Sequence, residues 1–403
     1  MTPRAQQPVH VPDELVVDFD YHDIAGADDD VQRAWLDAVV GPGKELFWTP
    51  HNGGHWVLTQ PEDIETVQRD YDRFSNRNYQ IPKTPRRYRP LPLGADPPEH
   101  RGYRALIAPA FSPRAVRDLS AKARALTIDL VGDLAPAGYC EFVSDFAKVL
   151  PIVVFLGIMD LPEEDREVLT PFAEAFVRGR TVEDRTIAAG QMADYLETWI
   201  DRRSADPGDD LLSHVAQSNV AGRAITRDEI FGLAILVMNG GLDTVATMLT
   251  MAMRHLALHD ESRRRLVSEP QLIPHAVEEL IRRHGIVANA REVVHDITFR
   301  GVELKAGDMV QIPTMIHGLS DETVDRPLEV DFDRPQPIPH ANFGNGVHKC
   351  PGANLARQEM TIALQEWLAR IPEFRMRRGS AGNAVTGSVS TLLSLELEWD
   401  PIG

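Results

Sequence analysis

The sequence predicts a mainly α-helical fold with a small β-rich portion. Apolar residues recur at helical spacing over most of the segment 96–283, and a last helical pattern covers residues 353–370. The segment 292–313 differs, because its short β-branched runs alternate with turn residues and indicate antiparallel strands. No composition shift separates these regions, so we expect residues 1–403 to form a single domain, with residues 1–30 as an irregular N-terminal arm.

Local signals place the first elements. A short strand pair is expected around residues 56–59, directly after two glycines. The segment 96–99 predicts a helix start, with Asp as the cap, proline in the first turn and Glu three residues after the cap. Thr226 and Glu229 predict a second capping box, opening a long helix that continues to about residue 259.

The overall composition excludes several classes of protein. With 43% hydrophobic and 25% charged residues, the chain is globular and neither disordered nor fibrous. Its formal net charge of −18 repels phosphate backbones and anionic lipid, so we expect neither a nucleic acid nor a membrane as partner. The N-terminus lacks the apolar run of a signal peptide, and the most apolar stretch, residues 230–238, is about half of the roughly 20 residues that span a bilayer. We therefore expect a cytoplasmic protein.

One of the two cysteines lies in a segment that indicates chemistry. Glycine turns precede Cys350 and a predicted helix follows it, so the helix dipole and free N–H groups favour the thiolate, a good metal ligand. A lone cysteine is more often a buried structural residue, and we keep that interpretation for Cys140. For Cys350, the glycine-containing loop and the adjacent His and Lys favour a role as metal ligand over a structural role. A zinc site is not indicated, because zinc would need several clustered ligands.

Two further patterns are ambiguous by themselves. Glu279 and Arg282 are spaced to form an ion pair on one helix face, which is often only a solvated surface pair. Gly240 and Gly241 fall inside the long helix, where each costs about 1 kcal/mol relative to alanine. Either a bulky ligand lies against them or another helix packs tightly there. Thr244 is spaced to donate back to the carbonyl of Gly240 and bend the helix.

The segment 343–357 resembles the haem-binding loop of cytochromes P-450, Phe-x-x-Gly-x-x-x-Cys-x-Gly, with Phe343, Gly346, Cys350 and Gly352 at the fixed positions. Further segments, such as 52–56, 240–245 and 366–372, resemble the bacterial camphor-hydroxylating family (camphor 5-monooxygenase), and the resemblance covers nearly the whole chain. It implies the triangular-prism P-450 fold, with haem between the long helix I and the cysteine loop with helix L. It also implies one haem b per chain, with Cys350 as axial thiolate and metal ligand.

The resemblance implies roles for residues outside the cysteine loop. Asp243 and Thr244 match the acid–alcohol pair that delivers protons during oxygen activation. Glu279 and Arg282 match a structural lock, with Arg334 as its third member, and Arg178 matches the arginine that pairs with Asp243. The residues that match positions around the haem are His100, Arg104, Arg291 and His348 for the propionates, and Phe343, Gly344, Gly240 and Gly241 for the ring.

The activity implied is that of a haem-thiolate monooxygenase, which uses O2 and two electrons. A 2Fe–2S ferredoxin with its NAD(P)H-dependent ferredoxin reductase would supply the electrons, docking on a basic patch of Arg73, Arg101, Arg104 and Lys349. Two alternatives are a peroxide-using haem-thiolate enzyme and a non-enzymatic haem-based sensor or electron carrier. A peroxide-using enzyme would lack the acid and the alcohol of the long helix, whereas Asp243 and Thr244 are both present. A sensor would need an output domain and an electron carrier a second axial ligand, and the sequence indicates neither. The monooxygenase is therefore favoured.

The expected substrate is small, apolar and terpenoid-like. Tyr88 matches the tyrosine that hydrogen-bonds the camphor ketone, whereas Asn239 departs from an apolar position in the family. Because the pocket is altered there, a norisoprenoid such as ionone is as good a candidate as a camphor-like monoterpenoid ketone. The residues expected to line the substrate pocket are Tyr88, Leu236, Asn239, Ile286 and Val287.

Overall fold

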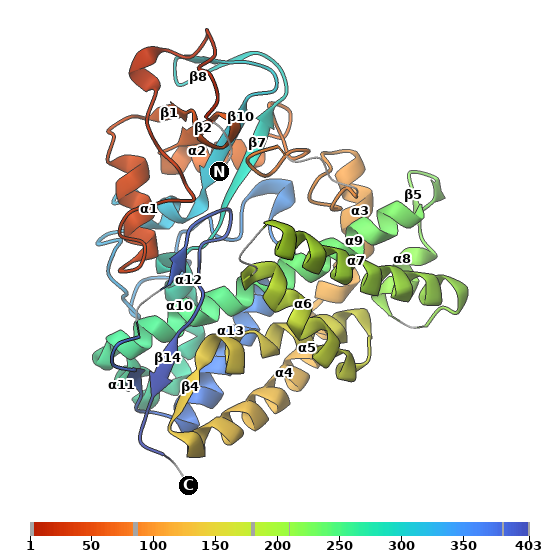
Figure 1. Ribbon diagram of the computed structural model, residues 1–403, viewed down its shortest axis with the longest axis vertical. Helices are drawn as coiled ribbons and strands as arrows, with labels where there is room; N and C mark the ends of the chain where they lie inside the picture. The colour runs from red at the N-terminus through yellow and green to blue at the C-terminus, as the bar shows by residue number, and fades with distance from the viewer. Residues whose placement is uncertain (1–3, 84–87, 179–181, 209, 381–382, 402–403) are drawn as a thin grey trace.

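The computed structural model describes residues 4–83, 88–178, 182–208, 210–380 and 383–401, and for residues 173–186 it describes no side chains. Helices form most of the molecule, and a sheet with helices α1 and α2 beside it forms one corner (Figure 1). The prediction of a mainly α-helical fold with a small β-rich portion is confirmed.

The helices are α1 (Val31–Val40), α2 (Pro61–Arg69), α3 (Glu99–Ile107), α4 (Pro113–Leu134), α5 (Val149–Met159), α6 (Arg166–Arg178), α7 (Val182–Ala205), α8 (Leu211–Ala216), α9 (Arg227–Leu242), α10 (Thr244–Leu258), α11 (Asp260–Ser268), α12 (Ile273–Arg283) and α13 (Ala353–Arg370). The strands are β1 (Leu46–Thr49), β2 (His55–Leu58), β3 (Phe74–Ser75), β4 (Tyr139–Glu141), β5 (Asn219–Val220), β6 (Arg223–Ala224), β7 (Ala288–Val293), β8 (Ile297–Phe299), β9 (Val302–Leu304), β10 (Met309–Pro313), β11 (Arg375–Met376), β12 (Ala384–Val385), β13 (Thr391–Leu392) and β14 (Glu396–Glu398).

The largest sheet has the strand order β1-β2-β10-β7-β3. The strand pair expected around 56–59 forms, with Trp48 opposite Trp56 across β1 and β2. The strands expected over 292–313 form as well: β7 and β10 are antiparallel, and β8 and β9 make a hairpin. At the tip of that hairpin Arg300 and Gly301 take φ of 50° and 75°, the left-handed conformation of a tight hairpin turn.

The N-terminal arm has little regular structure but is packed into the fold. Its only helical turn within residues 4–30 is Asp13–Leu15, while Phe19 and Tyr21 are buried in the same apolar cluster as Trp56 of the sheet. Asp308, which precedes β10, accepts from Trp56 Nε1 at 3.0 Å and lies 2.9 Å from His10 Nε2. The hydrogen bonds within the arm form only short turns, and its contacts with distant segments fix it against the sheet.

The predicted helix start at 96–99 is wrong in its register. Helix α3 begins at Glu99 with Pro98 as its cap, and no side chain caps it. The Asp96 carboxylate instead accepts from the backbone N–H of Asn76 at 2.9 Å and from Ser75 Oγ at 2.5 Å. A half-buried carboxylate that binds the end of β3 is not available to cap the helix that follows it.

The predicted capping box at the start of α9 is confirmed. Thr226 Oγ1 accepts from the backbone N–H of Glu229 at 3.3 Å, and a Glu229 carboxylate oxygen accepts from the N–H of Thr226 at 2.8 Å. The helix then continues as α9 and α10, which meet at Asp243.

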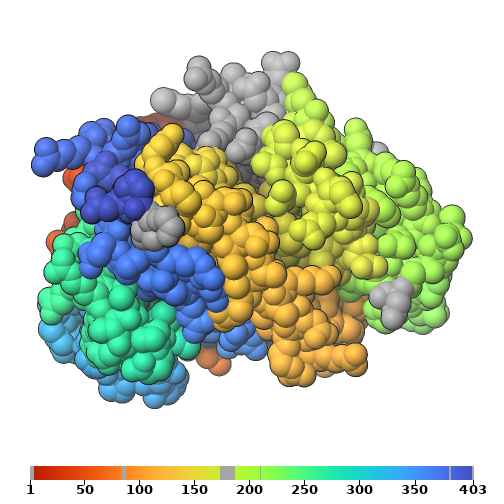
Figure 2. All heavy atoms as spheres, turned by 90° about the horizontal axis from the view of Figure 1, so that it is seen from below, coloured from red at the N-terminus to blue at the C-terminus, as the bar shows by residue number. Residues whose placement is uncertain are grey.

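Within the described residues, the segment Arg227–Leu258 is the one helix whose length and composition would suffice for a membrane span, and 56% of its most apolar window is buried in the fold. The apolar stretch predicted from the sequence, residues 230–238, was too short, since it stopped before Asn239 and left out the apolar helix α10. In the structure, α9 packs on α5, α7 and α8, and α10 packs on α13. Figure 2 shows α13 (blue) lying beside α4 (orange), in agreement with their extensive contacts.

Gly232 allows the loop that carries Tyr88 to lie on α9. The N–H of Leu91 donates to the Gly232 carbonyl at 3.0 Å, and a Cβ on Gly232 would lie 2.2 Å from the carbonyl oxygen of Arg89. We expect Gly232→Ala to lower the free energy of unfolding by about 1–3 kcal/mol, because the loop backbone must move away. Urea unfolding measures this change.

Gly132 provides the matched control, since it also lies inside a helix, α4, but an added Cβ there meets nothing within 4 Å. Gly132→Ala should raise the free energy of unfolding by about 0.5–1 kcal/mol, through helix propensity alone. Equal effects of the two substitutions would contradict the steric role of Gly232.

Candidate active site

The cysteine loop is a tight turn that leads into α13. Gly344 and Gly346 both take φ of 69°, and a Cβ on Gly346 would lie 3.0 Å from the backbone oxygen of Gln68. The N–H of Cys350 donates to the Phe343 carbonyl at 2.8 Å, which closes the loop. Glycine is required at 346 by both the conformation and the close approach.

The surroundings of the Cys350 sulfur suit a metal-binding thiolate. Burial raises the pKa of the thiol, whereas the backbone N–H groups of Gly352 and Ala353 and the guanidinium groups of Arg104 and Arg357 favour the thiolate. The two N–H groups belong to the start of α13, where a helix has unsatisfied donors. Cys140 differs, since it is buried, and neighbouring acids add to the burial that raises the pKa of its thiol. The structural interpretation of Cys140 therefore stands.

The two glycines of α9 face open space. A Cβ on Gly240 or Gly241 would meet nothing within 4 Å, so tight helix packing does not explain them. Asn239 and Gly240 are exposed in the middle of an otherwise buried helix. The Thr244 hydroxyl donates to the Gly240 carbonyl at 2.8 Å, as its spacing predicted, and the helix is interrupted at Asp243. Of the two explanations for these glycines, a ligand against this face is therefore favoured over a packed helix.

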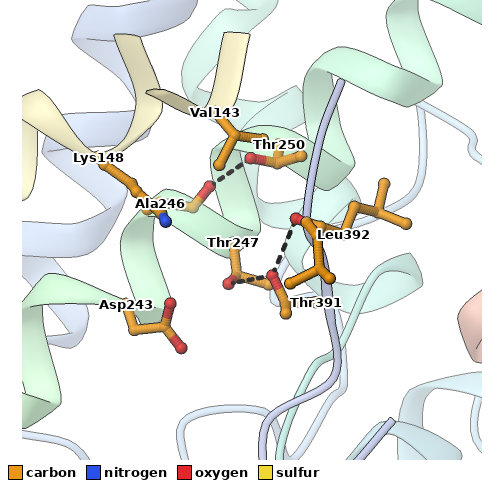
Figure 3. Close-up of a pocket in the computed structure, with 9 residues that line it drawn as sticks. Val143, Lys148, Asp243, Ala246, Thr247, Thr250, Thr391 and Leu392 are labelled. Atoms are coloured by element: carbon orange, nitrogen blue, oxygen red, sulfur yellow. Dashed lines mark hydrogen bonds between the residues drawn. The ribbon is translucent and has the colours of Figure 1, made fainter. Parts of the chain in front are cut away.

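Asp243, at the helix interruption, lines a small pocket (Figure 3). Burial raises the pKa of its carboxyl group, and the ammonium group of Lys148 acts in the opposite direction. Sequence reasoning missed Lys148, because it is distant in the chain and follows a π-helical turn that no spacing rule predicts. Arg178, the partner expected from the resemblance, ends α6, and its side chain lies outside the described residues.

Four cationic or titratable side chains gather between α3, β7 and the cysteine loop. The His100 and His348 rings lie 4.5 Å apart, and their ring nitrogens are buried without a hydrogen-bond partner among the described residues. Burial lowers the pKa of His100 to about 4. Arg291 is 3% exposed, and burial lowers the pKa of its guanidinium to about 10. Arg104 Nη2 donates to the Lys349 carbonyl at 2.8 Å.

Such a cluster needs an anion, since buried cationic and polar groups without partners are costly. Asp96 is the nearby carboxylate, but its oxygen is 3.8 Å from His348 Nε2 and it is already bound to the end of β3. The carboxylates of haem propionates fit the cluster, and one of its members, His348, lies two residues before Cys350 on the same loop. The residues expected to hold the haem therefore fit that group.

The residues expected to bind substrate fall into three places. Leu236 and Asn239 lie on α9 beside the two glycines. The Tyr88 hydroxyl, expected to donate to a ketone, donates instead to Glu197 of α7 at 2.7 Å, and its ring lies 4.0 Å from that of Phe231.

Ile286 and Val287 lie together on the segment before β7. Ile286 is 3% exposed within the apolar cluster of the large sheet, and Val287 is paired with Val389 by an isolated bridge. Leu236 and Asn239 therefore lie on α9 next to the two glycines, whereas the Tyr88 hydroxyl is engaged by Glu197.

The Glu279–Arg282 pair is buried and not a surface pair. Both side chains have 0% exposure, with Arg282 Nη2 at 2.7 Å from Glu279 Oε1. Arg334, the expected third member, places Nε 3.1 Å from Glu279 Oε2. Arg282 also donates to the backbone carbonyls of Gly318, Pro327 and Glu329, which fastens α12 to the segment before the cysteine loop.

Comparison with known proteins agrees with this geometry. The family model described as Cytochrome P450 matches residues 191–377. The probable cytochrome P450 127A1 of Sinorhizobium fredii is 33% identical over 401 residues, which are 97% of this chain and 96% of that protein. This chain belongs to the cytochrome P450 family. The mycinamicin IV hydroxylase/epoxidase of Micromonospora griseorubida is 33% identical over 336 residues, covering 81% of this chain and 84% of that P450.

Among solved P450 structures, CYP101J2 matches with a TM-score of 0.90 and 38% identity, covering 98% of this chain and 100% of that one. As a P450, the chain is an oxidoreductase that carries haem with a cysteine thiolate ligand, and this thiolate is Cys350. P450s of this type use O2 and redox partners. The haem supplies the centre at which O2 is activated.

Proposed function

We propose that this P450 hydroxylates a small, apolar, terpenoid-like substrate, a norisoprenoid such as ionone or a camphor-like ketone. It uses O2 and two electrons from a 2Fe–2S ferredoxin with its NAD(P)H-dependent ferredoxin reductase. Residues 1–403 act as a single domain in the cytoplasm. The observation that carries the proposal is the interrupted helix, where Asp243 and Thr244 directly follow two glycines whose added Cβ atoms would meet nothing within 4 Å.

The chain's own residues supply orientation and protons in this proposal. His100, Arg104, Arg291 and His348 hold the propionates, and Leu236 with Asn239 offers the substrate an apolar wall with a single amide. The Thr244 hydroxyl is held by the Gly240 carbonyl and presents its oxygen beside the open face. Asp243 takes up a proton in its pocket and passes it on toward Thr244.

Electron delivery is proposed to occur at the face that surrounds the cysteine loop. Arg101 and Lys349 are exposed, and Arg104 is bound to the backbone of Lys349, so three cations lie close to the loop. Arg73 of the proposed patch is engaged by Asp70. An acidic ferredoxin would be steered to such a patch although the whole chain is acidic.

Arg291→Leu tests the proposed propionate site. We expect haem loss to apomyoglobin to become at least about tenfold faster, because removal of a buried charge partner typically costs 2–5 kcal/mol. Lys83→Met serves as control, since Lys83 pairs with the neighbouring Glu292 on β7 but is 39% exposed. Unchanged haem loss in Arg291→Leu would contradict the assignment.

An optical titration of the purified ferric P450 with β-ionone and with camphor tests the substrate class. A compound that displaces water from the iron shifts the Soret band. The shift therefore measures the binding of β-ionone and of camphor separately. Turnover of the ligand that binds, with a 2Fe–2S ferredoxin, its reductase and NADH, should yield a hydroxylated product. Binding of neither compound would overturn the terpenoid proposal. Product formed with hydrogen peroxide but not with the ferredoxin system would favour the peroxide-using alternative.

A further inference from the structure

A lysine enters the interior next to the helix interruption. The π-helical turn η5 (Val143–Ala147) ends at Lys148, whose N–H donates to the Val143 carbonyl five residues earlier at 3.1 Å. A π turn adds a residue to the helical ladder and often occurs at functional sites. Because η5 packs on α10, this turn directs Lys148 inward, and the residue is only 8% exposed.

Lys148 shares a pocket with Asp243. Figure 3 shows the Lys148 ammonium group and the Asp243 carboxylate extending into the same space at the α9–α10 junction. Three threonines also line it: Thr247 Oγ1 and Thr391 Oγ1 are 3.0 Å apart, and the Thr250 hydroxyl donates to the Ala246 carbonyl at 2.8 Å. The pocket is lined by Val143, Lys148, Asp243, Ala246, Thr247, Thr250, Thr391, Leu392 and Leu393.

The electrostatics of this pocket make the lysine important. A carboxyl group taken out of water tends to remain protonated unless a cation compensates for the lost solvation. Facing Asp243 from η5 is the ammonium group of Lys148, while α10 and β13 contribute the neutral side chains of Thr247 and Thr391. Among the side chains that the structure describes, Lys148 is the cation that acts on Asp243.

We propose that Lys148 is the positioning residue of Asp243: its ammonium group stabilises the Asp243 carboxylate in the pocket and so determines when that group takes up a proton. In this role Lys148 acts on the reaction only through Asp243. This inference rests on the proposed function, in which Asp243 passes protons toward Thr244. It assigns to Lys148, on the turn before α5, the charge-pairing role that the family resemblance suggested for Arg178.

The direct test is an infrared pH titration of the haem-loaded protein without substrate. The C=O stretch of protonated Asp243 is identified as the band that disappears in Asp243→Asn. In Lys148→Met this band should persist to a pH higher by at least about one unit, the effect expected when an opposite charge is removed from a carboxyl group. Lys148→Arg should return the titration toward that of the unmodified protein, and Thr391→Val should leave it in place. Lys148→Gln replaces Lys148→Met if the latter does not fold.

A double-mutant cycle connects the titration to turnover. With β-ionone as probe, Lys148→Met should raise the share of NADH electrons that end as hydrogen peroxide at least about threefold. The same change in an Asp243→Asn background should have no further effect, because the interaction is already absent. An unshifted titration in Lys148→Met, or a shift seen only in Arg178→Met, would overturn the role of Lys148. A shifted titration in a protein that does not oxidise β-ionone would support the role of Lys148 while removing β-ionone as a substrate.

Discussion

Replacement of Glu279 by glutamine is expected to lower the free energy of unfolding by about 3–5 kcal/mol, because it leaves two buried guanidinium groups without their anion. Arg282 has 0% and Arg334 9% side-chain exposure, and both bind the Glu279 carboxylate. Glutamine preserves the shape of the side chain and some of its hydrogen bonds. The decrease in the free energy of unfolding therefore measures the effect of removing the negative charge. Urea unfolding of the haem-loaded protein measures it.

The control for Glu279 is a pair with the same spacing on the surface. Arg326 Nη1 lies 2.6 Å from Glu329 Oε2, three residues apart, with both side chains more than half exposed. Glu329→Gln is expected to leave the free energy of unfolding nearly unchanged, since solvent screens such pairs. Similar losses in both variants would show that burial of the Glu279 triad does not matter.

Replacement of Asp243 by asparagine is expected to lower the rate of product formation by about 10²–10⁴-fold, the range for loss of a group that transfers protons. The asparagine amide is similar in size to the carboxyl group but cannot take up or release a proton near neutral pH. Binding of substrate, followed by the Soret shift, should remain, because Asp243 lies in its own pocket and not among Leu236 and Asn239. The measurement is product per NADH consumed, with hydrogen peroxide determined in parallel.

Asp228→Asn is the matched control, since Asp228 lies exposed in the first turn of the same helix. It should leave the rate of product formation and the yield of peroxide unchanged. If Asp243→Asn also formed product at the original rate, protons would have to reach the site by a route that does not include Asp243.

Some parts of the site were predictable because their interactions are local in the chain. The capping box of Thr226 and Glu229, the ion pair of Glu279 and Arg282, and the bond from Thr244 to Gly240 each join residues three or four positions apart. Helical geometry brings such residues together whatever the rest of the fold does. The turn at the cysteine and the helix after it, Ala353–Arg370, are encoded in the same way, by closely spaced glycines and by apolar residues at helical spacing.

Other parts depended on which elements pack together. Tyr88 donates to Glu197 because α7 lies over the loop on α9, and Asp96 binds the end of β3 instead of capping α3. The sequence could not distinguish a ligand from a packed helix at Gly240, since only the surrounding chain shows that a Cβ there would meet open space.

The sequence by itself thus determined the cysteine ligand, its loop and the acid and alcohol on the long helix. The tertiary structure decided the burial of the Glu279 triad and the placing of Lys148 beside Asp243. The physical reason is that turns, caps and helical pairs are set by neighbours in the chain. Burial and charge partners are instead set by distant segments that meet only in the folded molecule.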